Sequence, residues 1–351
     1  MAVTKVSLKN ITVFDTLDLS FSGGIEVFLG VNGVGKTHVM KLLYSACQAA
    51  DPKTSFSHKL VRCFWPDDHR IARLVRKRSA KERTGGEDLS AVVRVTARTG
   101  DGTNKVLTAS FHDKTQRWNA DVTGEDGWEK QLDGRRSIFI PAKEILSHSY
   151  NLNAAVAMNN VSFDDTYLDV IDAAKIAISP GRDSAVKKQL LDRLEMIVDG
   201  KVSFDPKRDE FYLRKGNTRL EFNLVAEGVR KIALLWQLAK NGVLMDGSVL
   251  FWDEPESNID PVNIPVLADF LLELQRNGVQ IFLSTHDYFL AKYLELERKP
   301  EDKIQYHSFY LDGPGGVRTE TSRAFTLLEH NSIMETFVRL YEAEVDKEMR
   351  P

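Results

Sequence analysis

The feature that most constrains the fold of this chain is the run GVNGVGKT at residues 30–37, a complete G-x-x-x-x-G-K-T pattern. An apolar segment at 25–29 precedes it and apolar residues at helical spacing follow it, so we expect a buried strand, a glycine loop and a helix N-terminus. Backbone N–H groups and the lysine of such a loop hold phosphates, and the threonine hydroxyl binds Mg²⁺. The sequence therefore predicts that ATP and Mg²⁺ are bound through Asn32, Gly33, Val34, Gly35, Lys36, Thr37 and His38.

A second motif lies far downstream, where an apolar segment beginning at residue 249 ends in Asp253 and Glu254. Two adjacent carboxylates after a buried strand suit two separate tasks in ATP hydrolysis. We expect Asp253 to hold Mg²⁺ together with Thr37, and Glu254 to activate the attacking water. The presence of this second motif of an ATP site argues against the alternative that residues 30–37 form an ordinary glycine-rich turn with an unrelated lysine.

A third apolar segment, residues 279–285, is followed directly by His286, and residues 257–261 lie between the two segments. This order and spacing resemble the ATP-binding-cassette (ABC) superfamily, with 257–261 as the D-loop and His286 as the switch histidine. The resemblance implies that Lys36, Glu254 and His286 are catalytic and that Asp260 lies at the nucleotide. A lone histidine after a strand can also be an ordinary surface residue, and here its spacing from the carboxylate pair favours the catalytic role.

Alternating apolar residues at 6–14 and 17–21 predict two strands that lead into the phosphate-binding loop. This opening is similar to that of the SMC, RecF and OLD group. Within that group, segments 36–44 and 139–144 resemble the small stand-alone ATPases of the AAA-15/AAA-21 type. The resemblance implies an ATPase head that forms a homodimer, or a higher even-numbered oligomer, around ATP and Mg²⁺. It further implies a switch in bacterial anti-phage defence that controls a separate toxic effector, such as a nuclease.

Two other functions stay open at this point. One is a RecF-like ATPase that binds DNA during repair, and the other is a scaffold that binds ATP for assembly alone. A salt-sensitive DNA affinity that ATP strengthens would favour repair. Stable co-purification with the product of a neighbouring gene would favour defence.

The candidate signature segment is LVAEGVRK at residues 224–231. It lies about twenty residues before the strand that ends in Asp253 and Glu254, which resembles the Walker B motif of the superfamily. The family usually has serine at the position of Ala226, so we expect backbone N–H groups near Gly228 to hold the phosphate of the partner chain. Arg230 or Lys231 would assist from across the interface. The alternative is an ordinary buried helix with a basic first turn. No glutamine follows the strand at 137–141, and Glu144 is our substitute for the Q-loop residue near the metal.

The pattern of elements predicts an α/β P-loop NTPase fold, with an ABC-type head, a flanking antiparallel sheet and a short helical insertion. We divide the chain into a first core lobe with the P-loop, a flanking sheet with a basic insertion, a helical subdomain and a second core lobe. The expected boundaries of these four parts are 1–55, 56–136, 137–215 and 216–351.

Composition fits an intracellular ATPase, with 42% hydrophobic and 28% charged residues and a net charge of −3. We expect a cytoplasmic protein, because no apolar run approaches the length of a membrane span and no signal peptide is evident. Seven basic residues gather between Arg70 and Arg83. This cluster is a solvated face, a contact for the phosphate backbone of DNA, or a dock for an acidic partner.

The residues after His286 predict a helix, a hairpin near residues 312–316 and a terminal amphipathic helix. They are fewer than the roughly one hundred residues of a compact nuclease domain, and the chain contains no D-x-D pair for catalytic Mg²⁺. We therefore expect any effector activity to reside in another polypeptide. The terminal helix is expected to pack on the head or on a sister subunit, with effector docking as the alternative.

Overall fold

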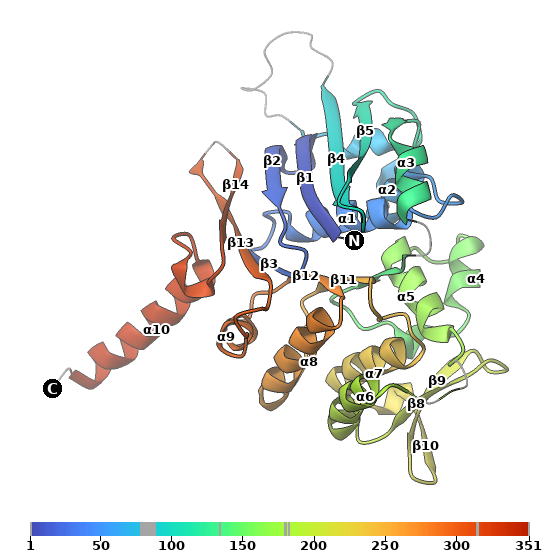
Figure 1. Ribbon diagram of the computed structural model, residues 1–351, viewed down its shortest axis with the longest axis vertical. Helices are drawn as coiled ribbons and strands as arrows, with labels where there is room; N and C mark the ends of the chain where they lie inside the picture. The colour runs from blue at the N-terminus through green and yellow to red at the C-terminus, as the bar shows by residue number, and fades with distance from the viewer. Residues whose placement is uncertain are drawn as a thin grey trace.

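The core is a mixed sheet of six strands within the residues that the computed structural model describes, 2–77, 89–132, 135–178, 181, 183–313 and 316–349. Its strand order is β14-β13-β3-β12-β11-β7 (Figure 1). All neighbours are parallel except the terminal hairpin of β13 and β14. The strands are β3 (Ile25–Gly30), β7 (Ser137–Ile140), β11 (Val249–Asp253), β12 (Gln280–Ser284), β13 (Ile304–Leu311) and β14 (Val317–Ser322). Because β3, β11 and β12 are parallel neighbours, their carboxyl ends meet at one edge.

The two faces of this sheet carry different side chains, because successive residues of a strand point in opposite directions. One face is an aromatic layer in which the rings of Phe251 and Phe282 stack at 5.0 Å. The other face carries aliphatic side chains and the fully buried Trp252. The aromatic layer consists of Phe28, Phe139, Phe251, Phe282 and Phe309. Both faces are therefore buried, as the continuous apolar runs in the sequence predict.

The aromatic layer is covered by helix α1 (Lys36–Gln48), which packs between the core sheet and a second, antiparallel sheet. The order of the second sheet is β2-β1-β4-β5-β6. Its strands are β1 (Ala2–Ile11), β2 (Phe14–Ser20), β4 (Ser90–Arg98), β5 (Asn104–His112) and β6 (Asp121–Thr123), with α2 (Phe56–Phe64) and α3 (Glu125–Leu132) nearby. The predicted flanking sheet is confirmed. Since β1 pairs with β4, this sheet spans the boundary that the sequence suggested at residue 55.

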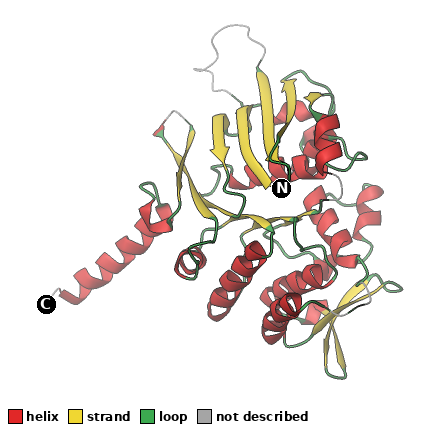
Figure 2. Cartoon of the chain, in the orientation of Figure 1, coloured by secondary structure: helices red, strands yellow, loops and turns green. Residues whose placement is uncertain are grey.

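The aliphatic face is covered by α7 (Glu227–Lys240), α8 (Ile264–Arg276) and α9 (Tyr288–Leu296). Beside them lies a helical region, which Figure 2 shows together with a small sheet. This region contains α4 (Leu152–Ala157), α5 (Asp165–Lys175), α6 (Ala185–Val198), β8 (Lys201–Asp205), β9 (Glu210–Lys215) and β10 (Thr218–Glu221). The expected helical subdomain therefore also includes an antiparallel sheet, which starts at residue 201.

A buried ionic network ties α5 to helices α1 and α2. The Lys59 ammonium donates to Asp165 and Asp169, both at 2.7 Å. Tyr44 of the P-loop helix donates to Asp169 at 2.5 Å, and Arg62 forms an ion pair with Asp165 at 2.6 Å. Such paired charges are costly to separate in a dry interior. The helical region is thereby held against the helix that begins at Lys36.

The chain ends in α10 (Ser332–Met349), which extends away from the body (Figure 1). None of its described residues is buried. Among the described residues, no helix has the length and apolar character needed to cross a membrane.

Candidate nucleotide site

The loop after β3 requires glycine at two positions for reasons of space. A side chain at Gly30 would lie 2.1 Å from the carbonyl oxygen of Phe309, and one at Gly35 would lie 2.6 Å from the ring of Phe14. Both residues also have positive φ angles, 136° and 91°, which side-chain-bearing residues rarely adopt. The glycine pattern thus folds the backbone tightly around the mouth of the loop. Asn32 and Gly33 are exposed at that mouth.

Other expected loop residues contribute in different ways. Val34 is fully buried in the aromatic-side core, so only its backbone can face a phosphate. His38 lies one residue beyond Thr37, with its ring 5.5 Å from that of Phe64. Burial and the nearby Lys41 ammonium lower the pKa of His38. The geometry therefore favours Val34 as a backbone contact and leaves the role of His38 a prediction.

Lys36 points back into the loop that it follows. Its Nζ donates to the carbonyl oxygens of Gly30 at 2.7 Å and Val31 at 3.1 Å, and it lies 3.0 Å from Nε2 of His286. The residue is 6% exposed, and burial lowers the pKa of its ammonium to about 8. A desolvated ammonium at the loop mouth is well suited to receive an anionic ligand.

The oxygen atoms expected to hold Mg²⁺ lie side by side. Thr37 Oγ1 donates to Asp253 Oδ2 at 2.9 Å, and Ser284 Oγ donates to the other carboxylate oxygen of Asp253. Hydroxyl and carboxylate oxygens are the hard donors that Mg²⁺ prefers. The residues present therefore fit a Mg²⁺ site between α1 and β11, with Ser284 orienting the carboxylate.

Glu254 and His286 face each other across the mouth. Glu254 Oε1 lies 3.9 Å from His286 Nε2, and the two side chains are 41% and 35% exposed. The backbone of Glu254 has a positive φ of 46°, which is unusual for a residue other than glycine. Burial and the Lys36 ammonium lower the pKa of His286, so its imidazole is neutral near pH 7.

Glu256 is a residue of this site that the sequence analysis missed. Its Oε1 accepts from Thr285 Oγ1 at 2.7 Å and from the backbone N–H of His286 at 3.1 Å. Burial raises the pKa of Glu256. The carboxyl group thus fixes the backbone that carries His286. Its position two residues after Glu254 is the signal from which it could have been found.

The signature-like turn packs on the D-loop of its own chain. A side chain at Gly228 would lie 2.2 Å from the carbonyl oxygen of Asn258, and Lys231 Nζ donates to the carbonyl oxygen of Ser257 at 2.9 Å. Lys231 is 2% exposed. Ala226, at the N-cap of α7, makes no side-chain hydrogen bond to the first turn. Asp260 caps the next turn by accepting from Val262 N at 3.1 Å.

Arg230 and Glu144 form a buried ion pair, with Arg230 Nε donating to Glu144 Oε2 at 2.6 Å. Arg230 also donates to the carbonyl oxygen of Val225 at 2.5 Å, and Ser147 Oγ donates to Glu144 at 2.8 Å. The structure therefore joins these two predicted site residues to each other. An Arg230 contact across an interface, or a Glu144 contact with metal, would require this pair to open, and both stay predictions.

The basic cluster is described only in part. Arg73 and Lys77 are exposed, and Arg73 lies 3.8 Å from Asp68. Arg76 lies 4.0 Å from Asp15. Three of the seven residues, Arg78, Lys81 and Arg83, lie outside the described residues. Contact of this cluster with DNA stays a prediction.

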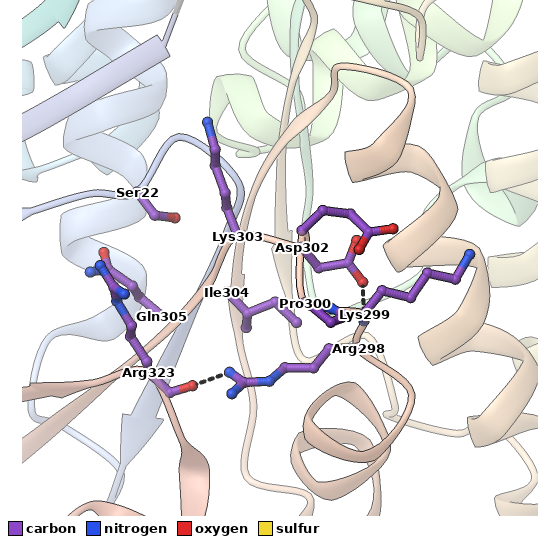
Figure 3. A pocket seen from close by; sticks show the side chains of 10 residues that line it. Ser22, Arg298, Lys299, Pro300, Asp302, Lys303, Ile304, Gln305 and Arg323 are labelled. Carbon is purple, nitrogen blue, oxygen red and sulfur yellow. Dashed lines mark hydrogen bonds between the residues drawn. The ribbon is translucent and has the colours of Figure 1, made fainter.

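A hollow of about 610 Å³ lies at the opposite end of the core sheet, beside the start of β13 (Figure 3). It is bordered by Arg298, Lys299, Lys303 and Arg323. Asp302 at the same hollow is paired with Arg276 at 2.6 Å. None of the ten residues drawn in Figure 3 belongs to the P-loop or Walker B motifs. We therefore place the candidate nucleotide site at the edge that carries Lys36 and Asp253.

Comparison with known proteins agrees with this arrangement. Residues 26–292 match the family model described as "AAA domain, putative AbiEii toxin, Type IV TA system". The DNA replication and repair protein RecF of Bacillus mycoides (strain KBAB4) is 35% identical over 69 residues, 20% of this chain and 18% of that protein. RecF of Lysinibacillus sphaericus (strain C3-41) is 37% identical over 79 residues, 22% of this chain and 21% of that protein. The matches thus span about a fifth of these relatives.

The fold is similar to that of SMC heads. An SMC head bound to the C-terminal winged-helix domain of ScpA gives a TM-score of 0.61 at 13% identity, covering 92% of this chain and 98% of that one. The SMC head domain from Thermotoga maritima gives a TM-score of 0.52 at 13% identity, covering 92% and 100%. These likenesses confirm the predicted P-loop NTPase fold of the ABC type.

Proposed function

We propose that this chain, which belongs to the AAA_21 family of AAA domains, is an ATP-hydrolysing switch. The chain is an ABC-type ATPase of the RecF- and SMC-like group. The observation that carries the proposal is the meeting of two pairs at one sheet edge. Lys36 lies 3.0 Å from His286, and Thr37 lies 2.9 Å from Asp253.

The chemistry follows from these groups. The Lys36 ammonium exchanges its loop carbonyl partners for phosphate oxygens of ATP. Thr37 and Asp253 would hold Mg²⁺, which would neutralise charge on the same phosphates. Glu254, exposed at the mouth, accepts a proton from the attacking water. The neutral imidazole of His286 forms a hydrogen bond at the terminal phosphate.

Substitution of Glu254 tests this assignment. Glu254→Gln keeps the side-chain volume but cannot accept the proton, so ATP binding should persist while turnover falls by about 100-fold or more. Phosphate release and retained nucleotide measure the two effects. Glu301→Gln, at an exposed carboxylate remote from the loop mouth, is the matched control. Turnover at the unsubstituted rate in Glu254→Gln would refute the role of Glu254.

We further propose that ATP joins two chains head to head. The first turn of α7 supports this proposal, because its backbone N–H groups are left without a side-chain cap and lie at a helix N-terminus. A terminal phosphate bound to one chain would then be held by α7 of the other. Activity per chain should rise with protein concentration across the range in which dimers form. Equal activity at all concentrations in a monomeric protein would contradict the proposal.

We propose that the switch controls a separate toxic effector in anti-phage defence. The family description, which names a putative toxin of a type IV toxin–antitoxin system, supports this assignment. A DNA-bound repair function is the second candidate, supported by the matches to RecF. Co-purification with the product of an adjacent gene, lost in Lys36→Ala, would support the effector. DNA affinity that ATP strengthens and salt weakens would support repair instead.

A further inference from the structure

Helix α10 leaves apolar side chains in water along its length. Phe337, Leu340 and Tyr341 are 41%, 60% and 63% exposed. Single exposed apolar residues are ordinary, but a row of them on a helix that projects from the body marks a contact surface (Figure 1). An isolated helix of this length is also only marginally stable in water, so packing must hold it.

The apolar row of α10 borders a hollow of about 400 Å³ that opens beside the nucleotide loop. Val31 of the P-loop and His286 contribute to the wall of the hollow, opposite Ile333, Phe337 and Leu340. Val31 is itself 46% exposed. Any molecule that closes over the nucleotide through this part of the mouth must therefore also cover the hollow.

The hollow is connected to His286 through an aromatic contact. The rings of Tyr288 and Phe337 stack at 4.2 Å with an interplanar angle of 3°. Tyr288 begins α9, two residues after His286, and Asp287 caps that helix by accepting from Leu290 N at 2.6 Å. A change in the position of α10 would thus be transmitted to the segment that carries the switch histidine.

We infer that the hollow receives the D-loop side of a second copy of this chain when ATP joins the two heads. The inference rests on the proposed function, which places the signature-like helix and D-loop of one chain opposite the P-loop of the other. Directly after the D-loop lies Val262, an apolar side chain at 73% exposure two residues beyond Asp260. An aliphatic side chain suits the apolar character of a wall that contains Val31, Phe337 and Leu340.

If the D-loop side of the partner packs in the hollow, α10 becomes part of a nucleotide site that the two chains share. The partner's Val262 enters the hollow, presses on Phe337 and, through Tyr288, settles His286 at the phosphate. Dimer formation is thereby coupled to the position of His286. The first turns of α10 pack on the head of its own chain through Ile333, Met334 and Phe337. Leu340, at 60% exposure, remains open to a partner.

The test uses Glu254→Gln chains, in which ATP persists, and compares two aspartate substitutions on α10. Leu340→Asp places a charge in the wall of the hollow, whereas Val338→Asp changes an exposed apolar residue of the same helix that does not line it. With ATP, analytical ultracentrifugation should show dimerisation weakened by about tenfold or more in Leu340→Asp and unchanged in Val338→Asp. ATP binding measured on monomers should be equal in both.

A second measurement tests the contact between the two surfaces by chemical cross-linking. Chains carrying Leu340→Cys and chains carrying Val262→Cys should be linked by a short bifunctional thiol reagent when ATP is present and not when it is absent. Dimers of Leu340→Asp as tight as those of Val338→Asp, or no link, would overturn the inference while leaving the proposed function standing. Failure of Glu254→Gln itself to dimerise with ATP would overturn both.

Discussion

The P-loop cluster and the signature cluster differ in how their charged groups are used. The P-loop cluster, defined as Lys36, Thr37, Asp253, Glu254 and His286, gathers polar groups at an open mouth. The signature cluster, defined as Glu144, Gly228, Arg230, Lys231 and Ser257, uses its charged groups inside its own chain. The first cluster is prepared for a ligand. In the second, the basic side chains are bound to groups of the same chain.

The largest expected effect is the loss of ATP affinity when the lysine of the P-loop cluster is replaced. Lys36→Ala removes the charge at the loop mouth and should weaken ATP binding by about 100-fold, or roughly 3 kcal/mol. Lys41→Ala is the matched control on the same helix, because its Nζ is bound to Asp164 at 2.7 Å. Calorimetric titration with ATP measures both. Equal affinity in the two variants would remove the P-loop cluster from nucleotide binding.

The second prediction concerns the ion pair of the signature cluster. Arg230→Met leaves Glu144, whose side chain is 1% exposed, without its cation and should cost about 3 kcal/mol of unfolding free energy. Adding Glu144→Gln should recover part of that loss, because the buried charge is then gone. Urea denaturation of the single and double variants gives the coupling energy. Additive losses would mean that the pair does not hold this cluster together.

The third prediction tests the close approach of the signature turn to the D-loop. Gly228→Ala forces a side chain against the carbonyl oxygen of Asn258 and should lower stability by about 2 kcal/mol, with dimer-dependent hydrolysis lost. Gly127→Ala lies in the first turn of α3, where the nearest atom would be 3.8 Å away. That control should be neutral or slightly stabilising. Equal melting curves for the two variants would contradict the tight packing.

The smallest expected effect is the pH dependence that burial of Lys36 causes. Its pKa falls to about 8 in the folded chain from 10.5 in the unfolded one, so the unfolded state binds more protons between these values. Stability of the nucleotide-free chain should therefore rise with pH in this window. This pKa shift corresponds to roughly 3 kcal/mol at pH 7. Lys36→Met removes that cost but also loses the hydrogen bonds to Gly30 and Val31, so it should be the more stable protein at pH 7 by about 1 to 2 kcal/mol. That advantage should shrink toward pH 10, which denaturant titrations at several pH values would show.

Local patterns predicted which residues of the P-loop cluster lie close together. Residues 25–37 and 249–254 are continuous in sequence, and their strand and loop geometry follows from apolar runs and glycine spacing. The carboxyl ends of parallel neighbouring strands must meet at one edge, which brings Asp253 and His286 to Lys36. The burial of Val34 behind the loop was not predicted, because the variable positions of the G-x-x-x-x-G-K-T pattern can be either exposed or buried.

The signature cluster could not be predicted in the same way, because its contacts join residues far apart in sequence. The pairing of Glu144 with Arg230 spans 86 positions, and nothing local to either residue indicates the other. Lys231 reaches a carbonyl of the D-loop only because α7 packs beside Ser257. The network around Lys59 is another long-range arrangement of this kind. Sequence alone identified Glu144, Arg230 and Lys231 as candidates, but not the direction in which their side chains point.

The left-handed backbone at Glu254 has an evolutionary consequence. A non-glycine residue in this conformation costs about 1 kcal/mol of stability relative to glycine, and its φ is 46°. Random mutation would relax this position toward glycine or asparagine unless selection for catalysis opposed the drift. A homologue that has given up hydrolysis should therefore lose this glutamate early while keeping the buried Trp252 before it. The residue at the position of Glu254 would then distinguish homologues that hydrolyse ATP from homologues that have lost this activity.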